Sequence, residues 1–276
     1  MGLTGHLDLV CGLDSRGLTS LRRQSFRAPM HVSKPYLQDG LLVVNVVNPT
    51  AGLLDGDRID CRIEVQPGAK MLLTAPSASR AHRMKGGRAE MHQEFRVGRG
   101  AFLEVLPELF IPQAGARYRQ STVCHVDEAG ELIFFETLAP GRVASGEAFA
   151  YQSLDWETNL FLEGNLIARE RYRMAPEGPE IETLRARFST AYYASCFVIT
   201  SRLDHESACW REIHELHTEN AWIGVSKLVS GGWVVKVVAE NSVTLRSIMS
   251  EIRGRLYMAL GEASPSLRSR YLQPQV

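Results

Sequence analysis

The stretch "RIDCRIEVQPGAKMLLT", residues 58–74, decides the fold class of this chain. In its first half Ile59, Cys61, Ile63 and Val65 alternate with charged residues, so one face is apolar and the other polar. Side chains on a β-strand point alternately to opposite faces, and this pattern therefore predicts a half-buried strand. Pro67-Gly68 then predicts a turn, and the apolar run after it predicts a second strand.

The same strand–turn–strand unit recurs on both sides of this stretch. Residues 41–47, "LLVVNVV", are apolar on both faces, as in a fully buried strand. Residues 90–97, "EMHQEFRV", alternate again, and a turn at Arg99-Gly100 leads into the apolar run 101–107. A strand and a turn follow each other about every 10 residues from about 40 to 173, which is typical of all-β folds. We therefore expect a mainly β fold of layered antiparallel sheets, either sandwich-like or β-helix-like.

The last third of the chain has a different pattern. A strand at 195–201 is followed by Cys209, Ile213 and Leu216 at helical spacing, and then by a predicted hairpin at about 221–239. A final helix, about 242–260, is expected to pack an apolar stripe on this hairpin; the stripe is Leu245, Ile248, Met249, Ile252 and Leu256. We expect one domain over 1–276, with a β-rich core at about 1–195 and a C-terminal β-α-β-β-α segment with two helices at about 196–276.

Composition excludes several classes of protein. Lys plus Arg and Asp plus Glu both total 31, so no global charge favours nucleic acid or an anionic membrane. The chain has neither a signal-like N-terminus nor a run of about 18 apolar residues, and we expect a cytoplasmic protein. Its five cysteines are scattered and form no CxxC pair, which disfavours disulfides and a zinc knuckle.

The glycine-rich loop "NPTAGLLDGD", residues 48–57, is the first candidate site. A phosphate-binding P-loop needs Lys and Ser or Thr after its last glycine, and a calcium loop needs acids at alternate positions; neither pattern is present. We expect Gly52 or Gly56 to have positive φ, with Asp57 accepting hydrogen bonds from amides of its own loop. The alternative is a surface presented to a partner.

Four acids in apolar surroundings are the second candidate: Glu104, Glu136, Glu147 and Glu163. A buried carboxylate without a partner is costly, so Glu136 should pair with Arg142 or face an internal polar channel. Carboxylate oxygens and water suit a divalent ion in transit, whereas tight binding of a transition metal needs His or Cys clusters. Structural salt bridges are the alternative for each acid.

His214 and His217 are three residues apart on the first C-terminal helix, close enough to share an ion. Glutamates interleave with them, and a solvated charged face is the favoured interpretation. The sequence does not match HExxH, and it has no GxSxG motif for nucleophilic catalysis.

Several motifs, in order along nearly the whole chain, resemble the urease accessory protein D family. They are the loop at 48–57 with its following strand and Pro-Gly-Ala, the segment "LPELFIPQ" at 106–113, and "FFETLAPGRVASGEAF" at 134–149. The stretch "SRAHR" at 79–83 corresponds to a Lys-aromatic-aromatic-Arg pattern of the family. The residues that match family motifs are Asn48, Pro49, Gly52, Gly56, Asp57, Thr74, Pro107, Pro112, Gly141, Arg142, Gly146 and Glu147.

The resemblance implies a urease maturation factor that is not an enzyme. Such a scaffold chaperone binds the urease apoprotein together with the accessory proteins F and G, the latter a GTPase, and helps to deliver nickel. It implies no tightly bound cofactor, with Ni²⁺ as transient cargo. Two alternatives remain open: a hydrolase using Glu104 and Glu136 in one cleft about 5–10 Å apart, and an interaction scaffold with no ion role.

Overall fold

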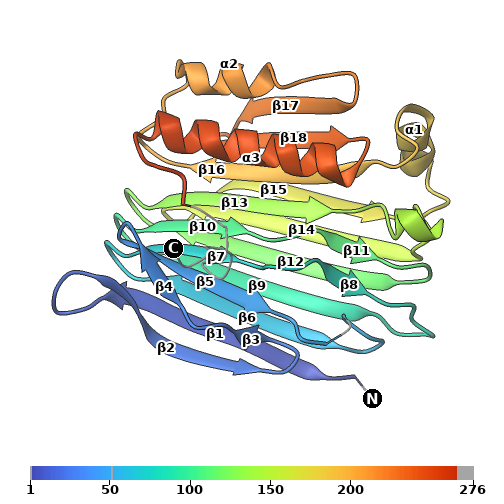
Figure 1. The fold of residues 1–276 in the computed structure, drawn as a ribbon, viewed down its shortest axis with the longest axis horizontal. Coiled ribbons are helices and arrows are strands. Elements are labelled where there is room, and N and C mark those ends of the chain that lie inside the picture. The colour runs from blue at the N-terminus through green and yellow to red at the C-terminus, as the bar shows by residue number, and fades with distance from the viewer. Residues whose placement is uncertain (1, 51, 266–276) are drawn as a thin grey trace, which may run out of the picture.

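The computed structural model describes residues 2–50 and 52–265. Two sheets face each other across an apolar interior, and helices cover part of the outer face of the larger sheet (Figure 1). The smaller sheet has the order β15-β14-β12-β9-β6-β1-β2. Its strands are β1 Thr4–Leu13, β2 Thr19–Arg27, β6 Arg58–Val65, β9 Ala89–Val97, β12 Arg117–Val126, β14 Ser153–Leu162 and β15 Asn165–Met174.

The larger sheet has the main order β17-β18-β16-β13-β10-β7-β5-β3. These strands are β3 His31–Val32, β5 Leu41–Val47, β7 Lys70–Thr74, β10 Phe102–Leu106, β13 Glu131–Leu138, β16 Tyr192–Ile199, β17 Ala221–Lys227 and β18 Gly232–Ala239. Three short strands join its margins: β4 Tyr36–Gln38, β8 Ser79–Ala81 and β11 Phe110–Pro112.

The core of the fold winds like a β-helix. After each of β6, β9 and β12 in the smaller sheet a tight turn carries the chain into the larger sheet, and a longer loop returns it. Successive coils stack in parallel, as the pairs β6 with β9, β9 with β12, β7 with β10 and β10 with β13 show. We call the side of the tight turns, at 66–69, 98–101 and 127–130, the turn edge, and the opposite side the loop edge.

The mainly β prediction is confirmed, and of its two forms the β-helix-like one is present. Antiparallel pairing was expected throughout, whereas the stacked coils pair in parallel; antiparallel pairs flank them, for example β14 with β15 and β13 with β16. The reason is that alternation along a strand shows which face is buried but not the direction of its neighbour. Within the coils the chain changes sheets after every main strand, so each sheet receives these strands in one direction.

The C-terminal segment has the predicted order β16, α2 (Ala208–His214), β17, β18 and α3 (Ser242–Ala259). Asn241 caps α3 by accepting a hydrogen bond from the Thr244 amide at 2.9 Å. All five residues of the predicted stripe are buried, and α3 packs over β16 and β18 (Figure 1). A further helix, α1 (Pro179–Arg187), lies in the part of the chain expected to be β; its weakly amphipathic sequence gave no helical pattern.

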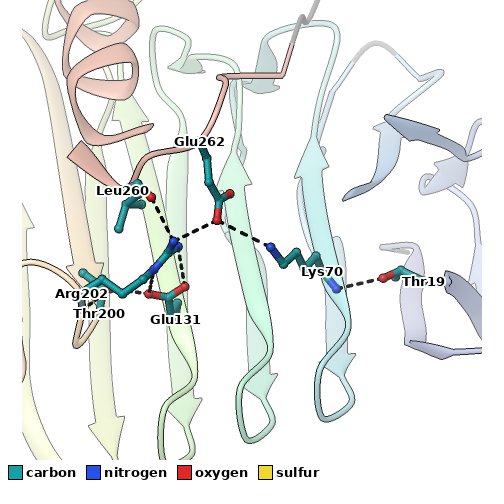
Figure 2. A network of polar contacts seen from close by, with 7 residues as sticks. All are labelled: Thr19, Lys70, Glu131, Thr200, Arg202, Leu260 and Glu262. Carbon is teal, nitrogen blue, oxygen red and sulfur yellow. Dashed lines mark hydrogen bonds and ion pairs between the residues drawn. The ribbon is translucent and has the colours of Figure 1, made fainter. Parts of the chain in front are cut away.

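The segment after α3 is tied to the turn edge by a polar network (Figure 2). Arg202 donates to both oxygens of Glu131 at 2.8 and 2.7 Å, to the Leu260 carbonyl at 3.1 Å and to Glu262 at 3.0 Å. Glu262 also lies 3.6 Å from Lys70 Nζ at the start of β7. The network holds the end of α3 against the beginnings of β7 and β13 and the end of β16.

Candidate functional site

The loop at 48–57 is shaped by its backbone. Gly52 has φ +138° and Gly56 has φ +83°, and a Cβ at Gly52 would lie 2.7 Å from the Arg80 carbonyl oxygen. Asp57 Oδ2 accepts a hydrogen bond from the Leu54 amide, and Oδ1 accepts one from the Leu3 amide, both at 2.8 Å. The prediction for this loop is therefore confirmed, with the addition that Asp57 also holds the N-terminal strand.

The motif residues scattered along the sequence come together at the loop edge. The winding of the chain brings four segments to this edge, and β8 and β11 belong to them (Figure 1). The segments are 48–57, 75–88, 107–116 and 139–152. In the last segment Gly141 has φ +142° and no room for a Cβ, which would lie 2.1 Å from the Glu147 carbonyl oxygen. Gly146 ends a short 3-10 turn in the left-handed conformation. These glycines shape the loops of the loop edge, where an opening lies near exposed Ser77.

An internal cavity of about 150 Å³ starts at this opening and runs between the two sheets. At about 30 Å³ per molecule it has room for roughly five waters. Asn48, Thr74 and Pro107 of the family motifs line it near exposed Ser77, and its inner end is lined by Gln93, Gln120, Glu136 and Trp156. The rest of its wall is mostly apolar. The cavity thus leads from a motif-rich opening to a polar interior.

Glu136 is the centre of that polar interior. Its side chain is buried on β13, and it accepts hydrogen bonds from Trp156 Nε1 at 2.7 Å and from Gln120 Nε2 at 3.2 Å. Thr158 Oγ1 lies 2.9 and 3.0 Å from its two oxygens, and Ser195 Oγ lies 3.5 Å from Oε2. Glu136 therefore links β12 and β14 of the smaller sheet with β13 and β16 of the larger one.

Burial raises the pKa of Glu136 to about 7. Hydrogen bonds from Trp156 and Thr158 oppose this rise because they stabilise the charged form, while the nearby charge of Glu170 adds to it. Glu136 therefore changes protonation state near neutral pH. Of the two expectations for this residue, pairing with Arg142 is wrong, since Arg142 binds Glu147. Glu136 instead faces a cavity that is polar around its carboxylate and mostly apolar elsewhere.

The other three candidate acids lie elsewhere, and none lines this cavity. Glu104 is fully buried and binds Arg253, whose Nη2 lies 2.8 Å from Oε2, and Tyr257, whose hydroxyl lies 2.7 Å from the same oxygen. Glu147 accepts from Arg142 Nε at 2.8 Å and from the Ala114 amide at 3.0 Å. These contacts, with Arg142 the larger cause, lower the pKa of Glu147 to about 2. Glu163 is exposed in the turn between β14 and β15.

Two acids at neighbouring cavities were missed by sequence reasoning. Glu108 lines both the central cavity and a second one of about 350 Å³ beside α3, where Arg246 binds it at 3.0 Å. Glu170 lines a third cavity of about 270 Å³, behind the stacked rings of Trp156 and Tyr172. Glu170 stands between two arginines on β15, and it faces the larger sheet, where Tyr193 of β16 and Lys236 of β18 each lie 2.7 Å from its Oε1.

The described residues include no group of three or more His, Cys, Asp and Glu side chains placed to hold one metal ion. His214 and His217 are exposed with ring centres 6.3 Å apart, and His217 Nδ1 accepts from the Ile223 amide. Cys61 lines the central cavity, and burial raises its pKa to about 12, so it is a thiol at neutral pH. The cavity offers two carboxylates, Glu108 and Glu136, and neutral oxygens, a set suited to weak contact with a hydrated ion.

Among the described residues, none of the helices combines the length and apolar character needed to cross a bilayer. All five cysteines are buried and free.

Glu104 and Glu136 lie on opposite faces of the larger sheet, since Glu104 contacts α3 and Glu136 faces the smaller sheet. They therefore do not form the shared cleft that the hydrolase alternative requires.

Comparison with known proteins agrees with the motifs. The family model described as UreD urease accessory protein matches residues 3–271. The urease accessory protein UreD of Opitutus terrae is 42% identical over 273 residues, covering 97% of this chain and 98% of the relative. Those of Deinococcus radiodurans and Acetivibrio thermocellus are 32% and 30% identical, covering 97% and 88% of this chain and 95% and 94% of the relatives.

Proposed function

This chain belongs to the UreD family of urease accessory proteins, and from that premise we propose that it acts as a scaffold through which nickel reaches urease. It binds the urease apoprotein together with the accessory proteins F and G, and it performs no catalysis of its own. Its five buried free cysteines are in keeping with a reducing cytoplasm. Nickel is cargo here, and no cofactor is held tightly.

The observation that carries this proposal is the central cavity. Family-motif residues Asn48, Thr74 and Pro107 line it near the loop edge, and a single buried carboxylate, Glu136, lies at its inner end. A carboxylate lowers the electrostatic cost of bringing a divalent cation into protein, and neutral oxygens replace part of its water shell. Because the cavity lacks a full set of nickel ligands, an ion can enter and leave it again.

The neighbouring cavities extend the proposed route. The cavity beside α3 shares Thr74, Pro107, Glu108 and Thr137 with the central one. Beyond the Trp156–Tyr172 stack lies the cavity lined by Glu170. We place a gate at this stack, with Glu108 before it and Glu170 after it, because Trp156 lines the central cavity and Tyr172 lines the third.

The alternative of a scaffold with no ion role is supported by the pairing of Glu104 and Glu147. Both acids act as structural ties, since each has an arginine partner and at least one further donor. The two hypotheses differ only in what the central cavity does. A variant that fills the cavity entrance without removing a polar group separates them.

Ala78→Trp fills the entrance, because Ala78 lines it near exposed Ser77. Ala263→Trp adds the same ring at an exposed position away from the cavities and is the matched control. We expect Ala78→Trp to assemble with the urease apoprotein and both accessory proteins, yet to leave most of the urease without nickel, measured as nickel per active site and as urease activity. The control should activate urease normally.

Two results would contradict this expectation. Full nickel loading with Ala78→Trp would show that the ion does not use the central cavity. Loss of assembly in Ala78→Trp, with Ala263→Trp unaffected, would make the entrance a binding interface and favour the scaffold with no ion role.

A further inference from the structure

The loop edge also carries a cluster of positive charge that the cavity does not use. Residues 80–88, "RAHRMKGGR", contain Arg80, Arg83, Lys85 and Arg88 and no acid. We call this segment the basic loop. The whole chain has zero net charge, so four cations within nine residues are a local concentration.

The backbone of the basic loop is fixed by hydrogen bonds to neighbouring loops. Met84 is buried in the core, and its amide donates to the Gly115 carbonyl at 3.1 Å. The next two amides, of Lys85 and Gly86, donate to Asp55 Oδ2 at 2.8 and 3.2 Å. The flanking side chains of Arg83 and Lys85 are exposed. The loop is therefore fixed in place while its cations face solvent.

Among the residues that the structure describes, three of these cations form no direct ion pair with a carboxylate, although the charge of Arg83 contributes to the lowered pKa of Glu147. Within the described part of the chain, no carboxylate oxygen lies within 4.0 Å of the charged nitrogens of Arg80, Arg83 or Lys85. Arg88 is the exception, since it binds Glu90. Arg117 adds a fourth cation with no such partner, because it donates to the Gly86 carbonyl and to Gln152.

On the outer face of the smaller sheet, by contrast, arginines form ion pairs with neighbouring acids. There Arg62 and Arg96 bind Glu94, and Arg171 binds Asp155 and Glu157. Charged side chains that cover a surface for solubility alone are commonly interspersed in this way, with both signs mixed. A rigid loop that keeps like charges together and unpaired is instead suited to an oppositely charged surface.

We propose that the basic loop is the docking surface for an acidic patch on a protein partner in urease maturation. The inference rests on the proposed function in one respect only, namely that the partner belongs to the complex that matures urease. The loop follows directly after Ser79, which lines the cavity, so a partner docked on it lies beside the cavity entrance. A nucleic acid fits less well, because the chain as a whole has zero net charge, whereas nucleic-acid-binding proteins carry an excess of basic residues.

The test begins with the isolated chain and a fluorescein-labelled octaglutamate peptide, followed by anisotropy. The triple variant Arg80→Glu, Arg83→Glu, Lys85→Glu should bind the peptide at least about tenfold more weakly, and binding by the unsubstituted chain should weaken as salt rises. The control variant is Arg22→Glu, Arg27→Glu, Lys34→Glu, which reverses three exposed cations elsewhere and gives the same net charge. It should bind like the unsubstituted chain.

Equal weakening in both triple variants would overturn the proposal, because the effect would then follow net charge and not the loop. Absence of salt-dependent binding would overturn it as well. If an eight-nucleotide oligothymidine bound as tightly as octaglutamate or more tightly, the proposal would be overturned, because the loop would then favour a nucleic acid over an acidic protein.

The second measurement is assembly with the urease apoprotein and the accessory proteins, by size-exclusion chromatography. The basic-loop variant should lose at least one of these partners while the control variant keeps all of them. Retention of every partner by the basic-loop variant would overturn the proposal. If the unsubstituted chain binds none of them, the proposed function fails, and the peptide measurement still decides the chemistry of the loop.

Discussion

Replacing Glu136 by Gln should remove a pH-dependent loss of stability. Burial raises the pKa of this carboxyl from its ordinary value of 4.5 to about 7. Between these two pH values the folded protein holds a proton that the unfolded chain has released. Stability therefore decreases as the pH rises through this window, and above about pH 7 the folded state carries the whole cost of the buried charge.

The size of the effect follows from the two pKa values. Each tenfold change in proton affinity corresponds to about 1.4 kcal/mol, so the buried charge destabilises the folded protein by about 3 kcal/mol at pH 8. Gln is nearly isosteric with the protonated acid. Its carbonyl oxygen can accept from Trp156 Nε1, and its amide can donate to the hydroxyls of Thr158 and Ser195, which rotate freely.

The assay is urea unfolding of the Glu136→Gln variant and the unsubstituted chain at a series of pH values from 5 to 8.5. Subtracting the two curves removes the contribution of all other titrating groups. We expect the advantage of the variant to grow from about 1 kcal/mol at pH 5 to about 3 kcal/mol at pH 8. A difference that does not change with pH would refute the reasoning, since it would mean that the four donor side chains hold Glu136 ionised throughout.

Three further perturbations have expected outcomes. Gly52→Ala should cost about 1–3 kcal/mol in urea unfolding, because φ is +138° and the new Cβ meets the Arg80 carbonyl; unchanged stability would show that the loop does not need this geometry. Ile252→Asp should abolish soluble expression by placing a carboxylate in the core, whereas Val243→Asp, on an exposed position of α3, should be tolerated; equal yields would contradict the packing of α3. Glu104→Gln should cost about 3–5 kcal/mol of unfolding free energy because it leaves the Arg253 charge buried and unpaired, and a loss below 1 kcal/mol would show that this pair is not a structural tie.

The order of motifs along the sequence was sufficient to identify the family, and local patterns were sufficient for many elements. Alternation in residues 58–65 predicted which side chains of β6 are buried, and the structure has Ile59, Cys61, Ile63 and Val65 buried. The helical spacing of apolar residues likewise predicted which side chains of α3 are buried. In both cases the signal is a spacing of two or of about 3.6 residues, which the backbone geometry of a single element fixes.

The tertiary structure alone decided how the coils pair and what surrounds Glu136. Its hydrogen-bond donors stand 16, 20, 22 and 59 residues away in sequence, on β12, β14 and β16. No local pattern contains that information, because the contacts depend on how successive coils stack and on the crossing from one sheet to the other. The sequence by itself determined that Glu136 stands in an apolar strand and needs a partner; which groups meet its carboxylate, and that a cavity opens beside it, followed only from the folded arrangement.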